Sequence, residues 1–257
     1  MKTLNLSTVV MPNGFLMAVN NDDPMADQMR CGFSYEQNHV AAFFDAWRQP
    51  GGFIDIGASW GYWCIRALDC GKSPIVAVEA NPMNLVPLGL NLTRMMEWPR
   101  LLPFIAGNDN AIRYVSGSSN TGQANRRSLD EPDDPTAMMV PTVRLDDFLG
   151  DVSLGGIKLD IEGYEFFAIQ GMVETIKRCR PVIVSEFSAL LLGQYHVDPL
   201  EFLAYMIKLG YKIGWTSPEP SERFDVACKV MDYRAALSHD DILKYGVENI
   251  LMVPDNL

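Results

Sequence analysis

The chain has 257 residues, a length that suits one large domain or a domain with a small added lobe. Apolar residues make up 48% of it, enough for a sizeable core without disulfides or metals. The 21 basic and 32 acidic residues give a net charge of −11. Because that charge repels nucleic-acid phosphates, we expect no nucleic-acid partner.

The cysteines and the apolar runs indicate the compartment. The five cysteines form no CxxC pair, a pattern that suits a reducing environment. The N-terminal stretch lacks the apolar region and the cleavage site of a signal peptide. No run of about 18 apolar residues is present. We therefore expect a soluble cytoplasmic protein with no membrane partner.

The first 50 residues read as an N-terminal cap. Two β-prone runs, Leu4–Met11 and Phe15–Asn20, flank Asn13-Gly14, which predicts a hairpin whose turn needs positive φ at both central positions. From Tyr35 to Trp47 the apolar residues follow helical spacing. We predict a hairpin and a helix over residues 1–50.

Residues 51–257 are predicted to form the main domain, because strand and helix patterns alternate there. Such alternation indicates an α/β fold with a mostly parallel sheet covered on both faces. We predict strands at Phe53–Ile56, Ile75–Val78, Leu101–Ala106, Ile157–Ile161, Val182–Phe187, Tyr211–Trp215, Phe224–Val230 and Ile250–Val253. Helices are predicted from Gly61 to Ala67, after Asn81-Pro82, and at Tyr164–Lys177 and Pro199–Leu209.

Two polar, turn-rich segments interrupt this alternation, at residues 116–135 and 217–223. A long loop in a compact domain is usually a functional lid or a disordered segment. Both readings stay open for residues 116–135.

The most informative segment is the turn from Gly57 to Gly61, which follows a predicted strand and enters a helix. Two glycines four positions apart let the backbone amides of Gly57, Ala58 and Gly61 approach a ligand closely. Glu79 closes the next strand, 22 positions after the first glycine (79 − 57 = 22). An acid at that place can accept two hydrogen bonds from a ribose diol.

Three ligands or chemistries compete for this geometry. A nicotinamide dinucleotide favours GxGxxG, and its pyrophosphate would sit badly beside Asp55. The segment also matches GxSxG, so Ser59 could be a hydrolase nucleophile with His196 or His239, but this leaves Asp55 and Glu79 without roles. S-adenosylmethionine fits best, because it is cationic and has a ribose but no pyrophosphate. Asp55 would attract its ammonium, directly or through water.

A second unusual segment is the strand that ends near Gly163. Alternation places Lys158, Asp160 and Glu162 on one face of it, and Glu186 ends the following strand. Charges in an interior strand are costly unless they are paired. They form either an internal ion-pair network or a ligand site at the carboxyl edge of the sheet, and we favour the second for Asp160.

At these residues the chain resembles the FkbM family of S-adenosylmethionine-dependent methyltransferases. The similar segments are DIGASWG (Asp55–Gly61), VEANP (Val78–Pro82), LDDFL (Leu145–Leu149), IKLDIEGYE (Ile157–Glu165) and, less specifically, the hairpin and GFSYE (Gly32–Glu36). The resemblance covers roughly residues 10–253. It implies a Rossmann-like class I methyltransferase sheet whose last strand is antiparallel. It also implies methyl transfer to a hydroxyl of a small molecule such as a sugar or polyketide.

The resemblance also assigns cofactor contacts. Where the family has Asn in the turn this chain has Ser59, whose hydroxyl can still donate to the cofactor carboxylate. Glu36 is expected to reach the cofactor amino group, and Ala80 to lie beside Glu79 at the same site. Apart from the resemblance, Asn108 and Asp109 follow the third strand, where they either contact an adenine amine or only make a turn. The rings that could stack near the sulfonium, or pack in the core instead, are Tyr35, Trp60, Tyr62 and Trp63.

Methyl transfer to an alcohol needs a group that accepts the hydroxyl proton. Asp160 is the first candidate for this base, followed by Glu186, Glu162 and His196, with Lys158 as a further member of the catalytic set. The three acids could instead hold a divalent metal, but without spacing evidence we predict no metal. A module that binds the cofactor without turnover, or a serine hydrolase that uses Ser59, remain the alternatives.

Overall fold

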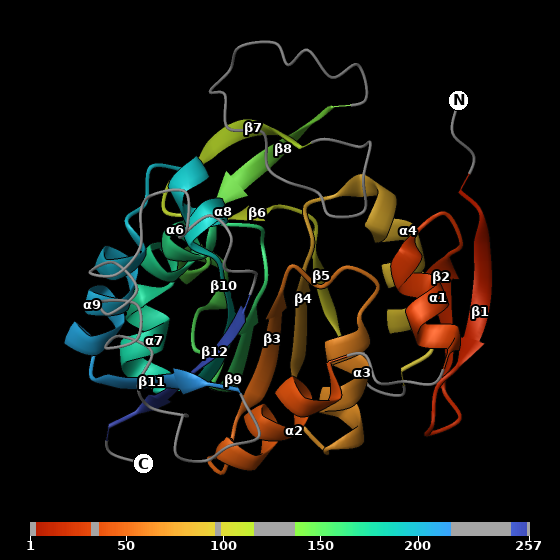
Figure 1. The fold of residues 1–257 in the computed structure, drawn as a ribbon, viewed down its shortest axis with the longest axis horizontal. Coiled ribbons are helices and arrows are strands. Elements are labelled where there is room, and N and C mark those ends of the chain that lie inside the picture. The colour runs from red at the N-terminus through yellow and green to blue at the C-terminus, as the bar shows by residue number, and fades with distance from the viewer. Residues whose placement is uncertain (1–3, 32–35, 96–98, 116–136, 217–247, 256–257) are drawn as a thin grey trace, which may run out of the picture.

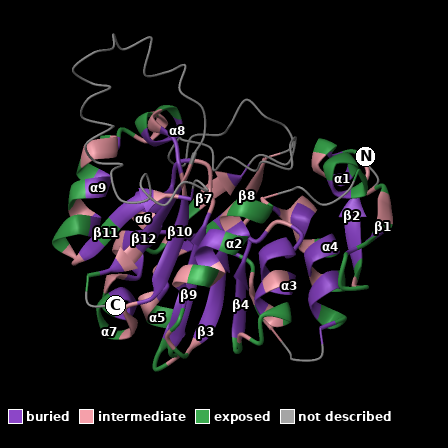
Figure 2. Cartoon of the chain, turned by 60° about the horizontal axis from the view of Figure 1, so that its bottom comes forward, coloured by how far each residue is buried: buried purple, intermediate pink, exposed green. Residues whose placement is uncertain are grey.

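The computed structural model describes residues 4–31, 36–95, 99–115, 137–216 and 248–255. Figure 1 shows a central sheet with helices on both faces and a separate hairpin beside the N-terminus. In Figure 2 the central strands are almost continuously buried, whereas the helices are exposed on their outer sides. None of the described helices is both long and apolar enough to cross a membrane.

The described residues form a seven-stranded central sheet. Its strands are β3 (Gly52–Ile56), β4 (Ile75–Val78), β5 (Arg100–Leu102), β9 (Leu154–Leu159), β10 (Val182–Phe187), β11 (Tyr211–Trp215) and β12 (Glu248–Pro254). They lie in the order β11-β12-β10-β9-β3-β4-β5. Strands β5, β4, β3, β9 and β10 pair in parallel, and β12 runs antiparallel to both of its neighbours. This topology confirms the predicted Rossmann-like class I sheet with its reversed last strand.

The two faces of the sheet are covered by different helices. One layer contains α2 (Gln37–Ala46), α3 (Tyr62–Asp69) and α4 (Pro82–Thr93), and the other contains α6 (Glu165–Gly171), α7 (Val173–Cys179) and α9 (Pro199–Lys208). Successive residues of β3 point to opposite faces. Phe53 packs in one core with Phe43 of α2, whereas Ile54 and Ile56 pack in the other core with Phe166 of α6. The sheet is therefore apolar on both sides, as a parallel sheet requires.

The predicted hairpin is present as β1 (Leu6–Val10) and β2 (Leu16–Asn20). The expectation about its turn is wrong, because only Gly14 of the Asn-Gly pair has a positive φ, of 83°. The amide of Gly14 donates to the carbonyl of Met11, which makes a four-residue turn with Pro12 at its second position. Proline fixes φ near −65° and favours this turn over the two-residue turn that we expected.

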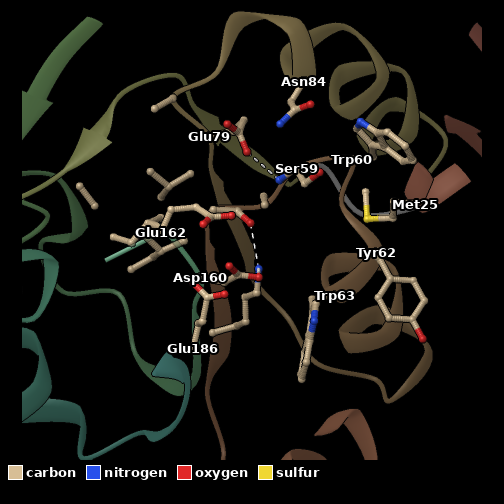
Figure 3. A pocket seen from close by; sticks show the side chains of 18 of the residues that line it. Met25, Ser59, Trp60, Tyr62, Trp63, Glu79, Asn84, Asp160, Glu162 and Glu186 are labelled. Carbon is tan, nitrogen blue, oxygen red and sulfur yellow. Dashed lines mark hydrogen bonds and ion pairs between the residues drawn. The ribbon is translucent and has the colours of Figure 1, made fainter. Parts of the chain in front are cut away.

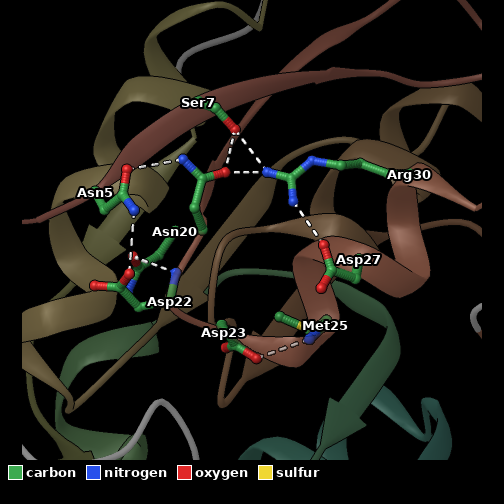
Figure 4. A network of polar contacts seen from close by, with 9 residues as sticks. Asn5, Ser7, Asn20, Asp22, Asp23, Met25, Asp27 and Arg30 are labelled. Atoms are coloured by element: carbon green, nitrogen blue, oxygen red, sulfur yellow. Dashed lines mark hydrogen bonds and ion pairs between the residues drawn. The ribbon is translucent and has the colours of Figure 1, made fainter.

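A helix that the sequence reading missed, α1 (Pro24–Arg30), follows the hairpin. Asp23 caps it by accepting from the amide of Met25, and Pro24 occupies its first turn. The guanidinium of Arg30 contacts Asp27 at 2.8 Å and Ser7 of β1 at 2.9 Å (Figure 4). These polar contacts join α1 to the hairpin. Met17 of β2 and Met29 of α1 pack in the same core as Phe43 and Phe53.

The predicted strand over residues 101–106 is two strands in two different sheets. Arg100–Leu102 is β5, whereas β6 (Ile105–Ala106) pairs with β8 (Met138–Val143), which in turn pairs with β7 (Ala111–Val115). Pro103 separates the two pieces, because it has no amide hydrogen for a ladder bond. This three-stranded sheet, and the short helices α5 (Asp146–Leu149) and α8 (Ala189–Gln194), were not predicted.

One further expectation concerns the middle of the chain. The helix predicted over Tyr164–Lys177 is divided into α6 and α7 at Met172. At the end of α6, Gly171 packs so closely on Gly107 that an added Cβ would lie 1.7 Å from the Gly107 carbonyl oxygen. The predicted strands at β3, β4, β10, β11 and β12 and the helices at α2, α3, α4 and α9 are confirmed within a few residues.

Several predictions fall outside the described residues. They concern Tyr35, most of the Gly32–Glu36 segment, the loop at residues 116–135, the segment at residues 217–223, the strand at Phe224–Val230 and His239. The division into residues 1–50 and 51–257 stays a prediction. The shared core of β2, α1, α2 and β3 shows that the N-terminal elements pack directly on the sheet.

Candidate cofactor and catalytic site

A cavity of about 320 Å³ lies where the parallel strands β3, β4, β9 and β10 end (Figure 3). Its volume falls in the range of small-molecule sites. The carboxyl edge of an open parallel sheet is also where such folds bind ligands. The predicted site residues that line it are Glu36, Gly57, Ala58, Ser59, Tyr62, Glu79, Ala80, Lys158, Asp160, Glu162 and Glu186.

The glycine turn after β3 is packed tightly against the chain that follows β9. Gly57 has a φ of 84°, and an added Cβ would lie 1.8 Å from the carbonyl oxygen of Asp160. The amides of Gly57 and Ala58 both donate to the carbonyl of Val78, at 2.9 and 3.0 Å. Only glycine fits at position 57, because that site has neither the space nor the conformation for a side chain. The turn is therefore a fixed corner in the wall of the cavity.

Ser59 is held in a conformation that residues other than glycine rarely adopt, with a φ of 48°. Its amide donates to Glu79 Oε2 at 2.7 Å, and the amide of Asn81 donates to Glu79 Oε1 at 2.6 Å. The Glu79 carboxylate is thus fixed at both oxygens while it still lines the cavity. Each carboxylate oxygen has a second lone pair, so Glu79 can accept further bonds from a ligand. Burial raises the pKa of Glu79 to about 7.

Asp55 lies behind the corner. It is fully buried in β3, and it is not part of the cavity lining. Its Oδ2 accepts from the Cys64 thiol at 3.4 Å, and its Oδ1 lies 3.5 Å from Lys158 Nζ. Burial raises its pKa to about 6. Asp55 thus lies outside the cavity lining, and its predicted attraction of a cofactor ammonium, directly or through water, stays a prediction.

Lys158 connects the buried acid to the cavity. Its ammonium lies 3.1 Å from Asp160 Oδ2 and donates to the carbonyl of Gly57 at 2.9 Å. It therefore joins Asp55, the glycine turn and Asp160 in one network. The charged strand therefore forms an internal ion-pair network that ends in a carboxylate on the cavity wall, and a ligand role for Asp160 stays a prediction.

Three carboxylates lie close together on the cavity wall, those of Asp160, Glu162 and Glu186 (Figure 3). Oxygens of Asp160, Glu162 and Glu186 all lie within 4.8 Å of one another. Glu186 Oε2 is buried and has no hydrogen-bond partner among the described residues. Burial and the nearby charges of Asp160, Glu165 and Glu162 raise the pKa of Glu186 well above its usual range. Burial also raises the pKa of Glu162.

Strand alternation accounts for Lys158 and Asp160, which lie 3.1 Å apart and whose backbone still bonds to β3 through the Asp160 amide. It does not account for Glu162, because β9 ends at Leu159. Glu162 instead has a φ of 57°, in the turn between β9 and α6. That turn, rather than the pleat of a strand, brings Glu162 beside Asp160. The oxygens of the three acids are close enough to share one divalent cation, so the prediction that no metal takes part stays a prediction.

Some predicted site residues do not reach the cavity. Asn108 donates to Gln170 at 2.7 Å, and both oxygens of Asp109 accept from Arg113 at 2.8 Å. Their side chains are thus engaged elsewhere, and neither residue lines the cavity. His196 is exposed and outside the lining. Gly61 begins α3 with a φ of 87° but also lies behind the wall.

The aromatic residues after the glycine turn do surround the cavity. Trp60, Tyr62 and Trp63 all belong to its lining. The indole of Trp63 donates to Glu36 Oε2, which fixes the carboxylate at the start of α2. Glu36 itself has a φ of 50°. The predicted role of Tyr62 and Glu36 at a cofactor is compatible with these positions.

Sequence reading missed one wall of the cavity. The lining also includes residues in or next to β2, α1, α4, β6 and α6: Met17, Asp23, Met25, Gln28, Met29, Asn84, Phe104, Ile105, Ala106 and Tyr164. A signal for part of this wall was present. Asp23-Pro24 has the same capping pattern as Asn81-Pro82, and it predicts α1 on the same grounds.

Comparison with known proteins places this geometry in a family. The sequence model of the FkbM methyltransferase domain matches residues 55–213, more than half of the chain. No curated protein sequence gave a significant match.

Solved methyltransferases are similar in structure. Methyltransferase FkbM from Methylobacillus flagellatus is 20% identical, with a TM-score of 0.47 over 74% of this chain and 48% of that one. The chain thus spans about half of that protein. The rRNA methylase from Streptococcus thermophilus is 8% identical, with a TM-score of 0.45 over 84% and 93%. The precorrin-6y C5,15-methyltransferase from Geobacter metallireducens is 15% identical, with a TM-score of 0.42 over 72% and 77%.

The family assignment rests on the sequence model rather than on these structural likenesses. The matched region begins at Asp55 and ends in β11, so it contains the glycine corner, Glu79 and the acid cluster. Membership supports methyl transfer as the chemistry of the site. The chain belongs to the FkbM methyltransferase family.

Proposed function

We propose that the chain binds S-adenosylmethionine in this cavity and transfers its methyl group to a hydroxyl of a small molecule. The observation that carries the proposal is the Glu79 carboxylate. Two backbone amides hold it at 2.7 and 2.6 Å beside a glycine corner, with acceptor capacity left toward the cavity. A ribose diol is the donor pair that such a carboxylate suits.

The rest of the lining fits the other parts of this cofactor. Ala80 with Phe104, Ile105 and Ala106 offers an apolar surface for an adenine ring. Glu36 offers a carboxylate to the ammonium group. The lining contains six acids, Asp23, Glu36, Glu79, Asp160, Glu162 and Glu186, but one lysine. The acids outnumber the lysine even when Glu186 keeps its proton, and this balance favours a cationic ligand over a pyrophosphate.

When bound, the cofactor supplies an electrophilic methyl group on a sulfonium. The residues of the chain must then hold the acceptor oxygen in line with that methyl and take up its proton. We assign the proton to Asp160, because it lines the cavity and is paired with Lys158 at 3.1 Å. The strongly raised pKa of Glu186 favours its protonated form, so its carboxyl group can donate a hydrogen bond to the acceptor and orient it.

A small-molecule acceptor agrees with the charge of the molecule. Nucleic-acid phosphates would meet a net charge of −11 and an acidic cavity. For the serine hydrolase alternative, His196 does not line the cavity with Ser59, and His239 lies outside the described residues. The second candidate is a module that binds the cofactor without turnover, and its ground is that Ser59 replaces the family's Asn.

Calorimetry with S-adenosylhomocysteine tests cofactor binding. We expect tight binding by the wild type and a loss of at least tenfold for Glu79→Ala, equivalent to about 1.4 kcal/mol. Glu174→Ala is the matched control, because Glu174 is an exposed acid paired with Lys177 and lies outside the cavity. No binding by the wild type, or equal binding by Glu79→Ala, would reject the proposed site.

A screen with labelled methyl donor separates the enzyme from the binding module. Hydroxylated sugars, polyketides and nucleosides are incubated with the protein, and transfer of label is measured. We expect transfer to at least one uncharged hydroxylated acceptor. Tight cofactor binding with no transfer to any acceptor would favour the binding module.

A further inference from the structure

The indole of Trp60 carries a buried donor that the roles assigned above do not use. Trp60 is 1% exposed and lines the same cavity as Glu79. Its Nε1 has no hydrogen-bond partner among the described residues. Buried donors are almost always paired in folded proteins, so a donor left open beside a cavity indicates a group that arrives with a ligand.

The direction of this donor is visible in Figure 3. The nitrogen of the indole lies on the side of the ring that faces Asn84, and Glu79 lies beyond Asn84 in the same view. Trp60 follows Ser59, whose amide holds the Glu79 carboxylate. The glycine corner thus presents a fixed acceptor and an open donor to one end of the cavity.

This pair matches the chemistry of a hydroxyl group. A carboxylate only accepts hydrogen bonds, whereas a hydroxyl donates one and accepts others. A diol that donates to Glu79 leaves its own oxygens in need of donors. The backbone amides of Ser59 and Asn81 cannot supply them, because both already donate to Glu79. The Trp60 indole is a donor that remains open on this wall.

We propose that Trp60 Nε1 donates to a hydroxyl of the same ribose diol from which Glu79 accepts. The inference rests on the proposed cofactor and adds a second positioning residue for its ribose. Trp60 then contributes to the choice of ligand, because a molecule without the hydroxyl leaves both Glu79 and the indole unpaired in a buried site.

Binding of two ligands to two proteins tests the assignment. S-adenosylhomocysteine and its 2′,3′-dideoxy analogue are titrated calorimetrically into the wild type and Trp60→Phe, which keeps an aromatic ring but removes the donor. We expect Trp60→Phe to bind S-adenosylhomocysteine roughly fivefold more weakly, the loss of one hydrogen bond. Both proteins should bind the dideoxy analogue equally.

Trp47→Phe is the matched control. Trp47 is equally buried, and its indole donates to the carbonyl of Gln49 at 2.9 Å outside the cavity lining. This variant should bind both ligands as the wild type does. Equal affinity of Trp60→Phe and wild type for S-adenosylhomocysteine would overturn the inference. So would an equal loss for both ligands, which would assign the effect to ring packing.

The experiment can reject the proposed cofactor and the role of Trp60 separately. No binding of S-adenosylhomocysteine by the wild type rejects the cofactor itself. Binding that is insensitive to Trp60→Phe rejects the role of Trp60 alone and leaves the cofactor in place.

A measurement on the unmodified protein keeps the test independent of how Trp60→Phe folds. The chain has five tryptophans, and the Trp60 indole resonance in a ¹⁵N-labelled sample is assigned with Trp60→Phe or by elimination with the other tryptophan variants. We expect its N–H signal to move downfield with S-adenosylhomocysteine and to stay in place with the dideoxy analogue. The same shift with both ligands would contradict a bond to the ribose.

Discussion

The carboxylates in and behind the cavity wall form two groups that differ in how they are paired. At the glycine corner, each oxygen of Glu79 accepts a hydrogen bond from a backbone amide. Behind that corner, Asp55 accepts a hydrogen bond from Cys64 and forms an ion pair with Lys158. In the second group, Asp160, Glu162 and Glu186 crowd together, and an oxygen of Glu186 has no partner among the described residues. The first arrangement fixes the Glu79 carboxylate in one position. The second is costly in the free protein and suits groups that exchange protons.

The largest effect is expected from Asp160→Asn. General-base catalysis contributes roughly a hundredfold or more, so turnover should fall by at least about that factor. Affinity for S-adenosylhomocysteine should change by only a few-fold, because Glu79 and the corner remain. Turnover is measured as methyl transfer to the acceptor found by screening, and affinity is measured by calorimetry.

The control for this variant is Glu201→Gln, an exposed acid in the first turn of α9. It should leave both quantities unchanged. Undiminished turnover of Asp160→Asn would show that another residue is the base. An equal loss of turnover and of cofactor affinity would show that Asp160 also contributes to cofactor binding.

The rigidity of the corner is tested by Gly57→Ala. The new Cβ would overlap the Asp160 carbonyl in a left-handed conformation, so we expect a loss of about 3 kcal/mol in the free energy of unfolding. Gly89→Ala is the matched change, because nothing lies within 4 Å of an added Cβ in α4. It should stabilise the protein by about 0.5–1 kcal/mol. Urea denaturation measures the free energy of unfolding of both variants. Similar values would mean that the glycine turn can adjust to a side chain at position 57.

Cofactor affinity should depend on pH through Glu79. Its pKa is about 7, and the deprotonated form is the better acceptor for the diol. Affinity for S-adenosylhomocysteine should therefore fall by up to about tenfold as the pH drops from 8 to 6. Glu79→Gln should flatten this dependence in calorimetry at several pH values. An unchanged slope in that variant would assign the titration to another group.

The smallest effect is expected in the free energy of unfolding, through Glu186 in the cluster of Asp160, Glu162 and Glu186. Glu186 keeps its proton to higher pH in the folded state than in the unfolded chain, so wild-type stability should fall as the pH rises above the usual range of glutamate. Glu186→Gln should therefore gain about 1 kcal/mol, and the gain should grow with pH. Glu79→Gln should instead lose stability, because one amide oxygen replaces two acceptors. Thermal unfolding across pH measures both, and a loss in Glu186→Gln would show that its charge stabilises the fold.

Much of this molecule follows from local sequence signals. Asn81-Pro82 starts a helix where predicted, the apolar run at Ile75–Val78 is a strand, and Gly57 occupies a turn that only glycine can adopt. Caps, periodicity and positive φ depend on a few neighbouring residues, so they can be read from the chain. Asp23-Pro24 carries the same signal, so α1 is predictable from the sequence as well.

The composition of the site depended on contacts between distant segments. The sequence determined that a glycine turn, Glu79 and a set of acids meet at the carboxyl edge of a parallel sheet, because parallel strands end at one edge. Only the tertiary structure decided that Asp55 lies behind the wall, that Asn108 and Asp109 face other partners, and that Trp60 faces the cavity. These outcomes depend on which side chains find partners across the fold, and such pairings leave no periodic trace in the chain.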